Sequence, residues 1–497
     1  MNFIDMFAGI GGFRKGLESN GHQCVFSCEL DNNAIKSYIS LYHMNEEEIA
    51  SMKKLNKSER DKTLENLRRQ HIFDDITKFD GMSEKEISKI IPKYDVFCGG
   101  FPCQPFSRAG RRNGFKDKNK GNLFFSIANV VEKTRPRYVF LENVKGLLTS
   151  GEKEEVVKNG KKRVVEIEKG KTFKEILYEL HELGYDVQWQ MVSSGHYIAH
   201  NRERVYIVAR KRGNKTIKRI FPLQENVRRI NKVSFEKDTQ VAYKDFINSI
   251  KSKTLYKFKI QENDMIDLYT NKSFNFNTKS PFGYWGIMVD GLCVTAKTKY
   301  KIAENEFKLI DVLEDYYKIG KRYDLSEEEV LKQRYAKKAK EWKSGNKMGN
   351  MAFPDKINKT CRTLTANASG REMMVIGYYF HEDGELHYIN EIKEGLNQFN
   401  QEKELNELVS QCPIDSKVNN ESNGLIIIEN ELGEEVHLKK SEIKFRKLTP
   451  REYWKLQGFD EEDFNRAKIV GVSDSQLKKQ AGNAVTVDVI KAIGERL

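Results

Sequence analysis

The sequence lacks any apolar run of membrane-spanning length, and its mean hydropathy is only -0.66. A spanning helix needs about 20 consecutive apolar residues, so no membrane-spanning protein is expected. Proline is scarce, with 9 residues in 497, and no low-complexity tract is present, which argues against a mostly disordered chain. The chain also shows no basic, apolar and small-residue leader after Met1, so we expect a cytoplasmic protein.

Paired cysteines are missing as well. The 7 cysteines are scattered, and none belongs to a Cys-x-x-Cys pair, so neither a disulfide framework nor a zinc site is expected. A cysteine that matters in this chain should therefore matter through its reactivity. The GxGxxG fingerprint is absent too, which favours another nucleoside-like ligand over a dinucleotide.

Positive charge, in contrast, is in excess. The chain carries 85 Lys+Arg against 72 Asp+Glu, a net charge of +13 with a pI near 9.1. This excess favours a polyanionic partner, nucleic acid before a membrane surface, although a basic enzyme without such a partner has the same balance. The 497 residues allow two or three domains, and 39% hydrophobic residues supply their cores.

Strand-like and helical segments alternate over the first 211 residues. The strand-like runs are 2–7, 23–30, 94–98, 138–142, 187–192 and 204–209. This alternation is typical of an α/β fold with a mixed, mainly parallel sheet. Two stretches look like insertions: an exposed helical one near 46–70, and a hairpin within 152–170 that turns at Asn159-Gly160.

The alternation ends at about residue 211. We expect a smaller, irregular α+β domain over 212–444, with an amphipathic helix within 326–342. The last segment, 445–497, looks globular again and returns to the first domain, ending in a helix from about Val487.

The first strand-like run leads into Gly9-Ile10-Gly11-Gly12. Glycines here let the backbone approach a ligand at a helix N-terminus, where amides favour an anionic group, although tight strand-to-helix turns use glycine anyway. Glu29 ends the second run, where doubly wound folds place an acid for ribose hydroxyls. Asp75 and Ile76 follow a further strand-like run. Taken singly, either acid is more readily explained as a solvated loop carboxylate.

The most informative segment is Gly100-Phe101-Pro102-Cys103-Gln104-Pro105-Phe106-Ser107. Two prolines bracket Cys103 and stiffen its loop, and a nucleophilic thiolate needs such an exposed, preorganised setting. Cys98, inside the preceding strand, is better explained as core. Arg108, Arg111 and Arg112 follow among glycines and suit a mobile lid that grips phosphates, although an ordinary surface loop has a similar composition.

Two further sites lie at strand ends. Glu142 ends an apolar strand, where open α/β sheets build their sites. Arg202 and Arg204 border the strand-like run 204–209, and their spacing of two places both side chains on one face.

Together these segments resemble the C5-cytosine DNA methyltransferases of bacterial restriction–modification systems. His200 departs from the family, which commonly has glutamine there, and the stretch where the family keeps its target-recognition domain is long. The matches occur in the family's order: 5–12 resembles its S-adenosylmethionine loop, 100–107 its catalytic loop, 142–144 its acid motif, 202–204 its arginine motif, 446–459 its ninth motif and 480–485 its tenth.

The resemblance implies a Rossmann-like methyltransferase domain that binds S-adenosyl-L-methionine, releases S-adenosyl-L-homocysteine and needs no metal. Glu29 is the candidate for the cofactor ribose and Asp75 for the adenine amino group. The implied cofactor-binding residues are Phe7, Ala8, Gly9, Gly11, Gly12, Glu29, Asp75, Ile76, Pro102, Asn483 and Val485.

The implied chemistry follows from the weakness of cytosine carbon 5 as a nucleophile. Cys103 would add to carbon 6, Glu142 would hydrogen-bond or protonate N3, and Arg204, assisted by Arg202, would orient the base oxygen. Because a stacked base is out of reach, the cytosine must be flipped out of the duplex.

DNA contacts are expected from the loop after Cys103 and from the recognition domain, where Thr363-Leu364-Thr365 resembles the family's short threonine–leucine elements. We expect residues 358–371 to lie near the major groove. The expected DNA-binding residues are Gln104, Ser107, Arg108, Arg111, Arg112, Arg362, Thr363, Leu364, Thr365 and Arg371.

The expected function is methylation of cytosine in a specific duplex DNA sequence, which protects host DNA from a cognate restriction endonuclease. We expect a monomer that acts at the nucleoid and forms no stable complex with that endonuclease. A Rossmann-type oxidoreductase or a Cys-dependent hydrolase would need a nicotinamide fingerprint or a His–Asx pair, and neither is evident. Retention of Cys103, Glu142 and Arg204 disfavours an inactive DNA-binding relative. The long basic second domain favours duplex DNA over the RNA substrate of a related methylase.

Overall fold

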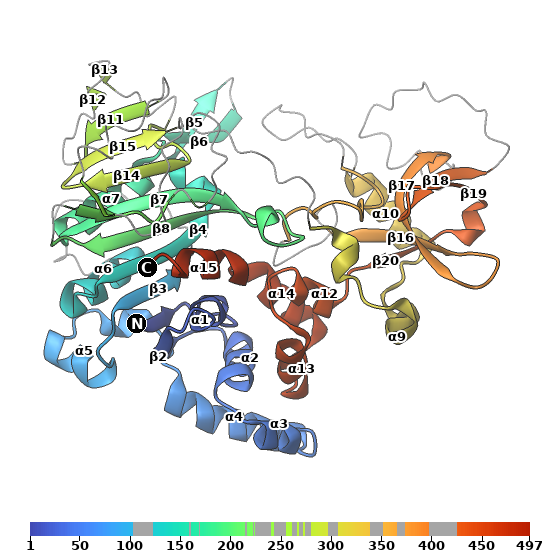
Figure 1. Ribbon diagram of the computed structural model, residues 1–497, viewed down its shortest axis with the longest axis horizontal. Coiled ribbons are helices and arrows are strands. Elements are labelled where there is room, and N and C mark those ends of the chain that lie inside the picture. The colour runs from blue at the N-terminus through green and yellow to red at the C-terminus, as the bar shows by residue number, and fades with distance from the viewer. Residues whose placement is uncertain are drawn as a thin grey trace.

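A computed structural model of the chain describes most of its residues. Its strands and helices form two lobes, one built on a nine-stranded sheet and the other on a five-stranded sheet (Figure 1). The described residues are 1–102, 123–158, 161–167, 169–213, 216–221, 223, 240–242, 255–260, 266–267, 272–273, 280–296, 307–337, 351–364, 373–396 and 425–497.

The large sheet has the order β11-β15-β14-β7-β8-β4-β3-β1-β2. Four neighbouring strands pair in parallel: β1 (Asn2–Met6), β2 (Gln23–Cys28), β3 (Val96–Gly100) and β4 (Tyr138–Val144). The others pair antiparallel: β7 (Tyr185–Ser193), β8 (Glu203–Lys211), β11 (Leu255–Lys259), β14 (Trp285–Val289) and β15 (Leu292–Ala296).

The α/β class and the mixed sheet are therefore confirmed. The expectation of mainly parallel pairing holds only for β1 to β4. Of the later strands, β7 and β8, and likewise β14 and β15, follow each other along the chain through short connections that only antiparallel neighbours can use. Strands β14 and β15, for example, are joined through Asp290 and Gly291, whose φ angles of 47° and 76° are typical of a two-residue hairpin turn.

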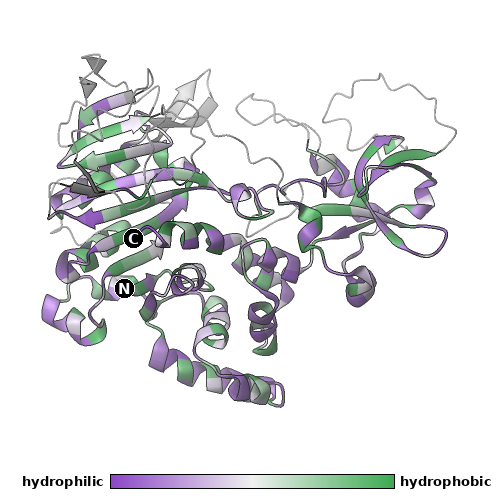
Figure 2. Cartoon of the chain, in the orientation of Figure 1, coloured by the Kyte–Doolittle hydropathy of each residue, from purple (hydrophilic) through white to green (hydrophobic). Residues whose placement is uncertain are grey.

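Alternating side chains cover the two faces of the large sheet. On β4, Tyr138 and Phe140 belong to the core under α1 (Gly12–Glu18) and α15 (Val487–Gly494). Val139 and Leu141 belong to the opposite core, under α5 (Glu84–Ile90), α6 (Leu123–Thr134) and α7 (Lys171–Glu182). Figure 2 shows the resulting pattern, with hydrophobic strands and helices that are hydrophobic on one side only. The chain's first and last helices thus share one face, and the expected C-terminal helix is confirmed.

A helical layer extends this lobe beyond β2. It contains α2 (Asn32–Tyr42), α3 (Glu46–Met52), α4 (Lys57–His71), α12 (Pro450–Lys455), α13 (Glu461–Ile469) and α14 (Asp474–Asn483). The expected insertion at 46–70 is helical, but it is not exposed throughout. Ile49, Met52 and Leu64 are buried in a core shared with α12 to α14, and Arg466 donates to the backbone carbonyls of Ser40 and Met44 at its base.

The expected hairpin is confirmed as β5 (Glu152–Lys158) and β6 (Lys161–Ile167), while its Asn159-Gly160 turn lies outside the described residues. Two other small ribbons pair β9 (Thr216–Lys218) with β10 (Gln240–Ala242) and β12 (Ile266–Asp267) with β13 (Lys272–Ser273). Within the described ranges, no helix is long and apolar enough to cross a membrane.

The second lobe is an antiparallel sheet of order β19-β18-β17-β16-β20. Its strands are β16 (Val375–Phe380), β17 (Leu386–Glu394), β18 (Ile426–Asn430), β19 (Glu435–Leu438) and β20 (Lys444–Lys447), flanked by α9 (Tyr316–Ile319) and α10 (Glu327–Lys337). Helix α10 confirms the helix expected after residue 326, and its Val330 is buried in one core with Val375, Ile389 and Phe445.

The strands divide the chain differently from the expected boundaries at 211–212 and 444–445. Strands β11, β14 and β15 lie in the expected recognition domain, 212–444, but they extend the large sheet beyond β7. Strand β20 lies partly in the expected return segment, but it pairs with β16 in the second lobe. A strand's own sequence pattern does not show which sheet it joins, so these pairings were not expected. The boundaries of the recognition domain stay a prediction.

Candidate active site

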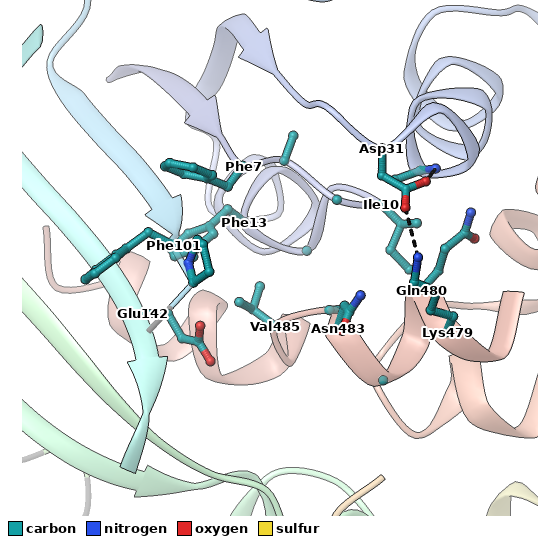
Figure 3. A pocket seen from close by; sticks show the side chains of 18 of the residues that line it. Phe7, Ile10, Phe13, Asp31, Phe101, Glu142, Lys479, Gln480, Asn483 and Val485 are labelled. Atoms are coloured by element: carbon teal, nitrogen blue, oxygen red, sulfur yellow. Dashed lines mark hydrogen bonds and ion pairs between the residues drawn. The ribbon is translucent and has the colours of Figure 1, made fainter. Parts of the chain in front are cut away.

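A cavity of about 550 Å³ opens at the carboxyl ends of β1 to β4, together with the turn between α14 and α15. The carboxyl ends of parallel strands share one edge of a sheet, where open α/β folds bind their ligands. Figure 3 shows Phe7, Phe13, Phe101 and Glu142 toward one end, and Asp31 and Lys479 toward the other. One end of the cavity is thus apolar except for the carboxyl group of Glu142, and the other end is polar.

The turn after β1 needs its glycines for two different reasons. Gly11 has a φ of 84°, and a Cβ there would lie 2.3 Å from the Tyr42 ring. At Gly12 a Cβ would lie 2.6 Å from Cγ2 of Val485, so the start of α1 packs directly against the turn that follows α14. Phe7, Ala8, Gly9 and Gly12 line the cavity, whereas Gly11 shapes the turn and is not among the lining residues; the cofactor role of all five stays a prediction.

Glu29 is fixed at the cavity wall by backbone amides. Its Oε2 accepts from Gly9 N at 2.7 Å, and its Oε1 accepts from Leu30 N and Asp31 N, both at 2.8 Å. A carboxylate has about four acceptor positions, so one remains for a ligand hydroxyl. The glycine turn and the end of β2 are therefore held together by the residue expected to bind ribose.

Asp31 lines the polar end of the cavity, although it was not among the expected site residues. Its Oδ1 caps α2 by accepting from Asn33 N and Ala34 N, and its Oδ2 lies 3.2 Å from Lys479 Nζ. Partial burial opposes ionisation, but these hydrogen bonds and Lys479 hold the pKa of Asp31 below its usual range.

Asp75 and Ile76 are not among the cavity-lining residues. Asp75 caps the short helix η1 (Ile76–Phe79) by accepting from Thr77 N at 2.9 Å, and the Ile76 side chain is buried in the core. The preceding Phe73 pairs with Cys28 at the end of β2, so this segment lies beside the site. The cofactor role of both residues stays a prediction.

Glu142 and Arg204 form the charged centre of the site. Strands β4 and β8 pair so that Arg204 faces Val144, and Arg204 Nε lies 3.0 Å from Glu142 Oε1. Burial raises the pKa of Glu142 above its usual value, although Arg204 and Arg202 oppose the rise. A buried acid of this kind suits proton donation to a ring nitrogen. Gly100 leaves it room, since a Cβ there would lie 3.2 Å from Oε2.

Arg202 lines the cavity but has different partners. Its buried guanidinium donates from Nη1 to the carbonyls of Gly482 at 2.9 Å and Leu364 at 3.3 Å. Burial and the neighbouring Arg204 lower the pKa of Arg202 to about 10. Arg202 therefore connects the tenth-motif turn and the recognition segment (residues 360–364) to the start of β8.

The expected recognition residues divide into two groups. Thr363 and Leu364 line the cavity beside Arg202. The Arg362 side chain instead reaches into the second lobe, where Nε lies 2.9 Å from Asp355 Oδ1 and Nη2 donates to Met373 O at 2.6 Å. The structure does not bring Arg362 to the cavity, and its contact with DNA stays a prediction.

Several expected residues lie outside the described part of the chain. Pro102 lines the cavity, and Cys103 follows it directly in the sequence. All five described cysteines, Cys24, Cys28, Cys98, Cys293 and Cys361, have pKa values raised by burial, which disfavours a reactive thiolate at any of them. The expected residues outside the description are Cys103, Gln104, Ser107, Arg108, Arg111, Arg112, Thr365 and Arg371.

The sequence matches one protein-family model over the whole chain. The model of the C-5 cytosine-specific DNA methylases matches residues 1–62 and 52–497. The chain belongs to this family. The resemblance inferred from the motifs is therefore confirmed.

Individual relatives match to different extents. The DNA-cytosine methyltransferase of Escherichia coli K12 is 32% identical over 240 residues, which are 45% of this chain and 44% of that protein. The type II methyltransferase M.HpaII of Haemophilus parainfluenzae is 37% identical over 209 residues, 41% of this chain and 45% of its own length. The chain thus spans less than half of the length of these two relatives. The orphan methyltransferase M.SPRI of Bacillus phage SPR is 26% identical over 535 residues, 100% of this chain and 97% of its own.

Sequence reasoning did not identify part of the cavity wall. Phe13 follows the 5–12 match and Phe101 lies within the 100–107 match; both contribute apolar surface, and attention to the apolar residues in and beside the motifs would have found them. Gln480, Gly482 and Ala484 also line the cavity and lie within the 480–485 match to the tenth motif. Gln476 and Lys479 of α14 carry no local signal, because only the packing of that helix brings them to the cavity.

Proposed function

We propose that this protein transfers a methyl group from S-adenosyl-L-methionine to carbon 5 of a cytosine in a specific sequence of duplex DNA. One observation carries the proposal: a single cavity is lined by the glycine turn, by the Glu142–Arg204 pair and by Pro102, the residue before Cys103. Membership of the C-5 cytosine-specific DNA methylases supports cytosine as the target.

The cavity fits the proposed cofactor. Its volume of about 550 Å³ is typical of small-molecule sites. A Cβ placed on Gly9 would meet no atom within 4 Å, so the backbone of the turn is open to a ligand. Glu29 keeps an acceptor position for a hydroxyl, and Phe7, Phe13 and Val485 provide apolar contacts. When bound, S-adenosylmethionine supplies the electrophilic methyl group that carbon 5 of the cytosine accepts.

The protein's own residues would prepare the cytosine for that transfer. The Cys103 thiolate forms a bond to carbon 6, and Glu142 gives a proton to N3 as electron density enters the ring. Arg204, held by its ion pair with Glu142, orients the base oxygen. After carbon 5 is methylated, its proton leaves to water and the bond between Cys103 and carbon 6 breaks to restore the thiolate. N3 returns its proton to Glu142, which regenerates the acid and releases neutral 5-methylcytosine.

The cytosine would reach this site by flipping out of the duplex, at a cost of a few kcal/mol that DNA contacts must offset. We assign those contacts to the loop after Cys103 and to a recognition region within 212–444. Residues 1–211 and 445–497 supply the catalytic machinery. In this proposal, the protein acts as a monomer in the bacterial cytoplasm and protects host DNA from a restriction endonuclease.

Bisulfite sequencing tests the proposal directly. The protein is expressed in a host without cytosine-5 methylation, beside Cys103→Ala as the matched control. We expect protected cytosines in one sequence context with the parent enzyme and none with Cys103→Ala. The variant should still bind S-adenosylhomocysteine in calorimetry. Absence of protected cytosines with the parent enzyme, or equal protection by the variant, would contradict the proposal.

A further inference from the structure

His200 lies fully buried where three segments of the chain meet. Its Nε2 lies 2.9 Å from Leu364 N in the recognition segment, and its Nδ1 lies 3.1 Å from Leu456 O at the end of α12. A backbone N–H only donates and a carbonyl only accepts. Nε2 must therefore be an unprotonated acceptor and Nδ1 must carry the hydrogen, which defines a neutral imidazole with one tautomer.

The recognition segment, residues 360–364, runs beside residues 199–202 at this point. Cys361 N donates to Ala199 O at 2.9 Å, and Asn201 N donates to Cys361 O at 2.8 Å. The hydroxyl of Thr363 donates to Asn201 O at 2.6 Å. This short stretch of parallel pairing joins the two lobes immediately before β8, which carries Arg204.

The Leu364 residue is held from both sides. Its N–H donates to His200, and its carbonyl accepts from Arg202 Nη1 at 3.3 Å. Leu364 also lines the cavity and lies three residues after Cys361, which pairs with His200. If Nε2 were removed, a buried N–H would lose its acceptor, and movement of the segment toward water would be its simplest relief.

We propose that His200 is a positioning residue, which holds the recognition segment at a fixed distance from the catalytic arginine strand by accepting the Leu364 N–H. The inference rests on the proposed function, because the segment matters only if it contacts the DNA. His200 would not touch the substrate itself. Its effect would appear in DNA binding and in discrimination between sequences, while cofactor binding and the fold should be affected little.

The two arms of His200 can be tested separately. The amide of glutamine reaches about as far as Nε2, whereas the amide of asparagine reaches only as far as Nδ1. His200→Gln should therefore keep the acceptor for Leu364 N, and His200→Asn should keep only the donor to Leu456 O. His200→Leu, which has neither group, serves as a further variant if the asparagine variant folds poorly.

The experiment measures kcat, KM for a duplex with the methylated sequence, and the methylation ratio between that duplex and single-mismatch duplexes. Melting temperature and S-adenosylhomocysteine affinity are the controls. We expect His200→Gln to stay within about threefold of the parent enzyme. His200→Asn and His200→Leu should raise KM and lower the ratio by about tenfold each, the scale of one buried hydrogen bond.

The outcomes separate the two claims. Equal values for the glutamine and asparagine variants would overturn the positioning role, as would losses that only follow the melting temperature or S-adenosylhomocysteine affinity. A parent enzyme that methylates no cytosine would instead refute the proposed function, and the inference with it.

Discussion

The two lobes hold their functional residues by different means. In the large-sheet lobe, adjacent strand ends, glycine contacts and a buried ion pair fix the cavity. The second lobe contributes Thr363 and Leu364 to that cavity, and these two residues are held by hydrogen bonds between the lobes. The sheet thus fixes the residues proposed for the chemistry, while hydrogen bonds and the burial of Cys361 and Leu364 in a core shared with Trp454 fix the recognition segment. Changes in the first lobe should affect kcat and cofactor affinity, and changes in the second should affect KM and sequence preference.

Asp355 and its partners Lys337, Arg362 and Val375 form an anchor inside the second lobe. Asp355 accepts from the buried Lys337, from Arg362 Nε at 2.9 Å and from Val375 N at 2.8 Å. Its carboxylate thereby links α10, the strand β16 and the start of the recognition segment. No residue of this anchor lines the cavity. The anchor can therefore be disturbed without touching the catalytic groups.

The largest effect is expected at Glu142. Glu142→Gln keeps the shape of the side chain but removes the proton donor, so kcat should fall by about 10² to 10⁴-fold, as for a lost general acid. Single-turnover methylation would measure the fall, and calorimetry with S-adenosylhomocysteine should show little change in cofactor affinity. A kcat within a factor of a few of the parent value would contradict the role of Glu142.

Asp355→Ala should have the next largest effect, in the second lobe. The change leaves Lys337 buried without its counter-charge, which costs about 3 kcal/mol in comparable buried pairs. Hydrogen exchange of peptides from 373–396 should become faster, and KM for DNA should rise with S-adenosylhomocysteine affinity preserved. Lys356→Ala is the matched control, because its pair with Glu391 is partly exposed and should contribute under about 1 kcal/mol. Equal effects of Asp355→Ala and Lys356→Ala on hydrogen exchange and on KM would contradict the role of the buried Asp355–Lys337 pair.

Gly12→Ala should weaken cofactor binding by a smaller amount. The added methyl group would lie 2.6 Å from Cγ2 of Val485, and relieving that overlap costs about 1–3 kcal/mol in a packed site. Calorimetry should show weaker S-adenosylhomocysteine binding, with sequence preference retained. Gly213→Ala is the control, because a Cβ there meets open space. If sequence preference changed while cofactor affinity did not, the division of roles between the lobes would fail.

The smallest effect concerns pH. Burial lowers the pKa of Lys337 to about 8, although Asp355 opposes the shift, whereas an unfolded lysine titrates near 10.5. Between these values the unfolded chain binds more protons than the folded one, so this group raises the free energy of unfolding as pH increases. The stability difference between the parent and Lys337→Met should therefore grow in favour of the parent from pH 8 to 10.5. A flat or opposite trend would contradict the burial of this charge.

Much of the catalytic lobe was predictable because its signals are local. A strand followed by closely spaced glycines predicts the turn at Gly9–Gly12, and an acid at the end of an apolar strand predicts Glu142. The links between the lobes were not predictable, because they join distant residues. Arg202 reaches carbonyls 162 and 280 residues away, and His200 reaches an amide 164 residues away. Sequence periodicity does not predict such contacts. It also does not predict that the strands β14 and β15 join the large sheet.

Arg202 illustrates the same difference within one motif. Its spacing of two from Arg204 predicts that both side chains lie on one face, and both residues line the cavity. Their partners differ, because Arg204 forms an ion pair with Glu142 whereas Arg202 donates to two carbonyls. The sequence pattern predicts that a charge is present, but only the packing shows what that charge contacts.

The central claim is that Cys103 attacks carbon 6 of a flipped cytosine beside Glu142 and Arg204. The most direct test incubates the enzyme and S-adenosylmethionine with a duplex carrying 5-fluorocytosine at the methylated position, followed by mass spectrometry of the digested complex. Fluorine replaces the proton that must leave carbon 5, so the adduct should persist. We predict a stable cross-link on the peptide containing Cys103, and none with Cys103→Ala. The account would be contradicted by the absence of a cross-link, or by one on another cysteine such as Cys412.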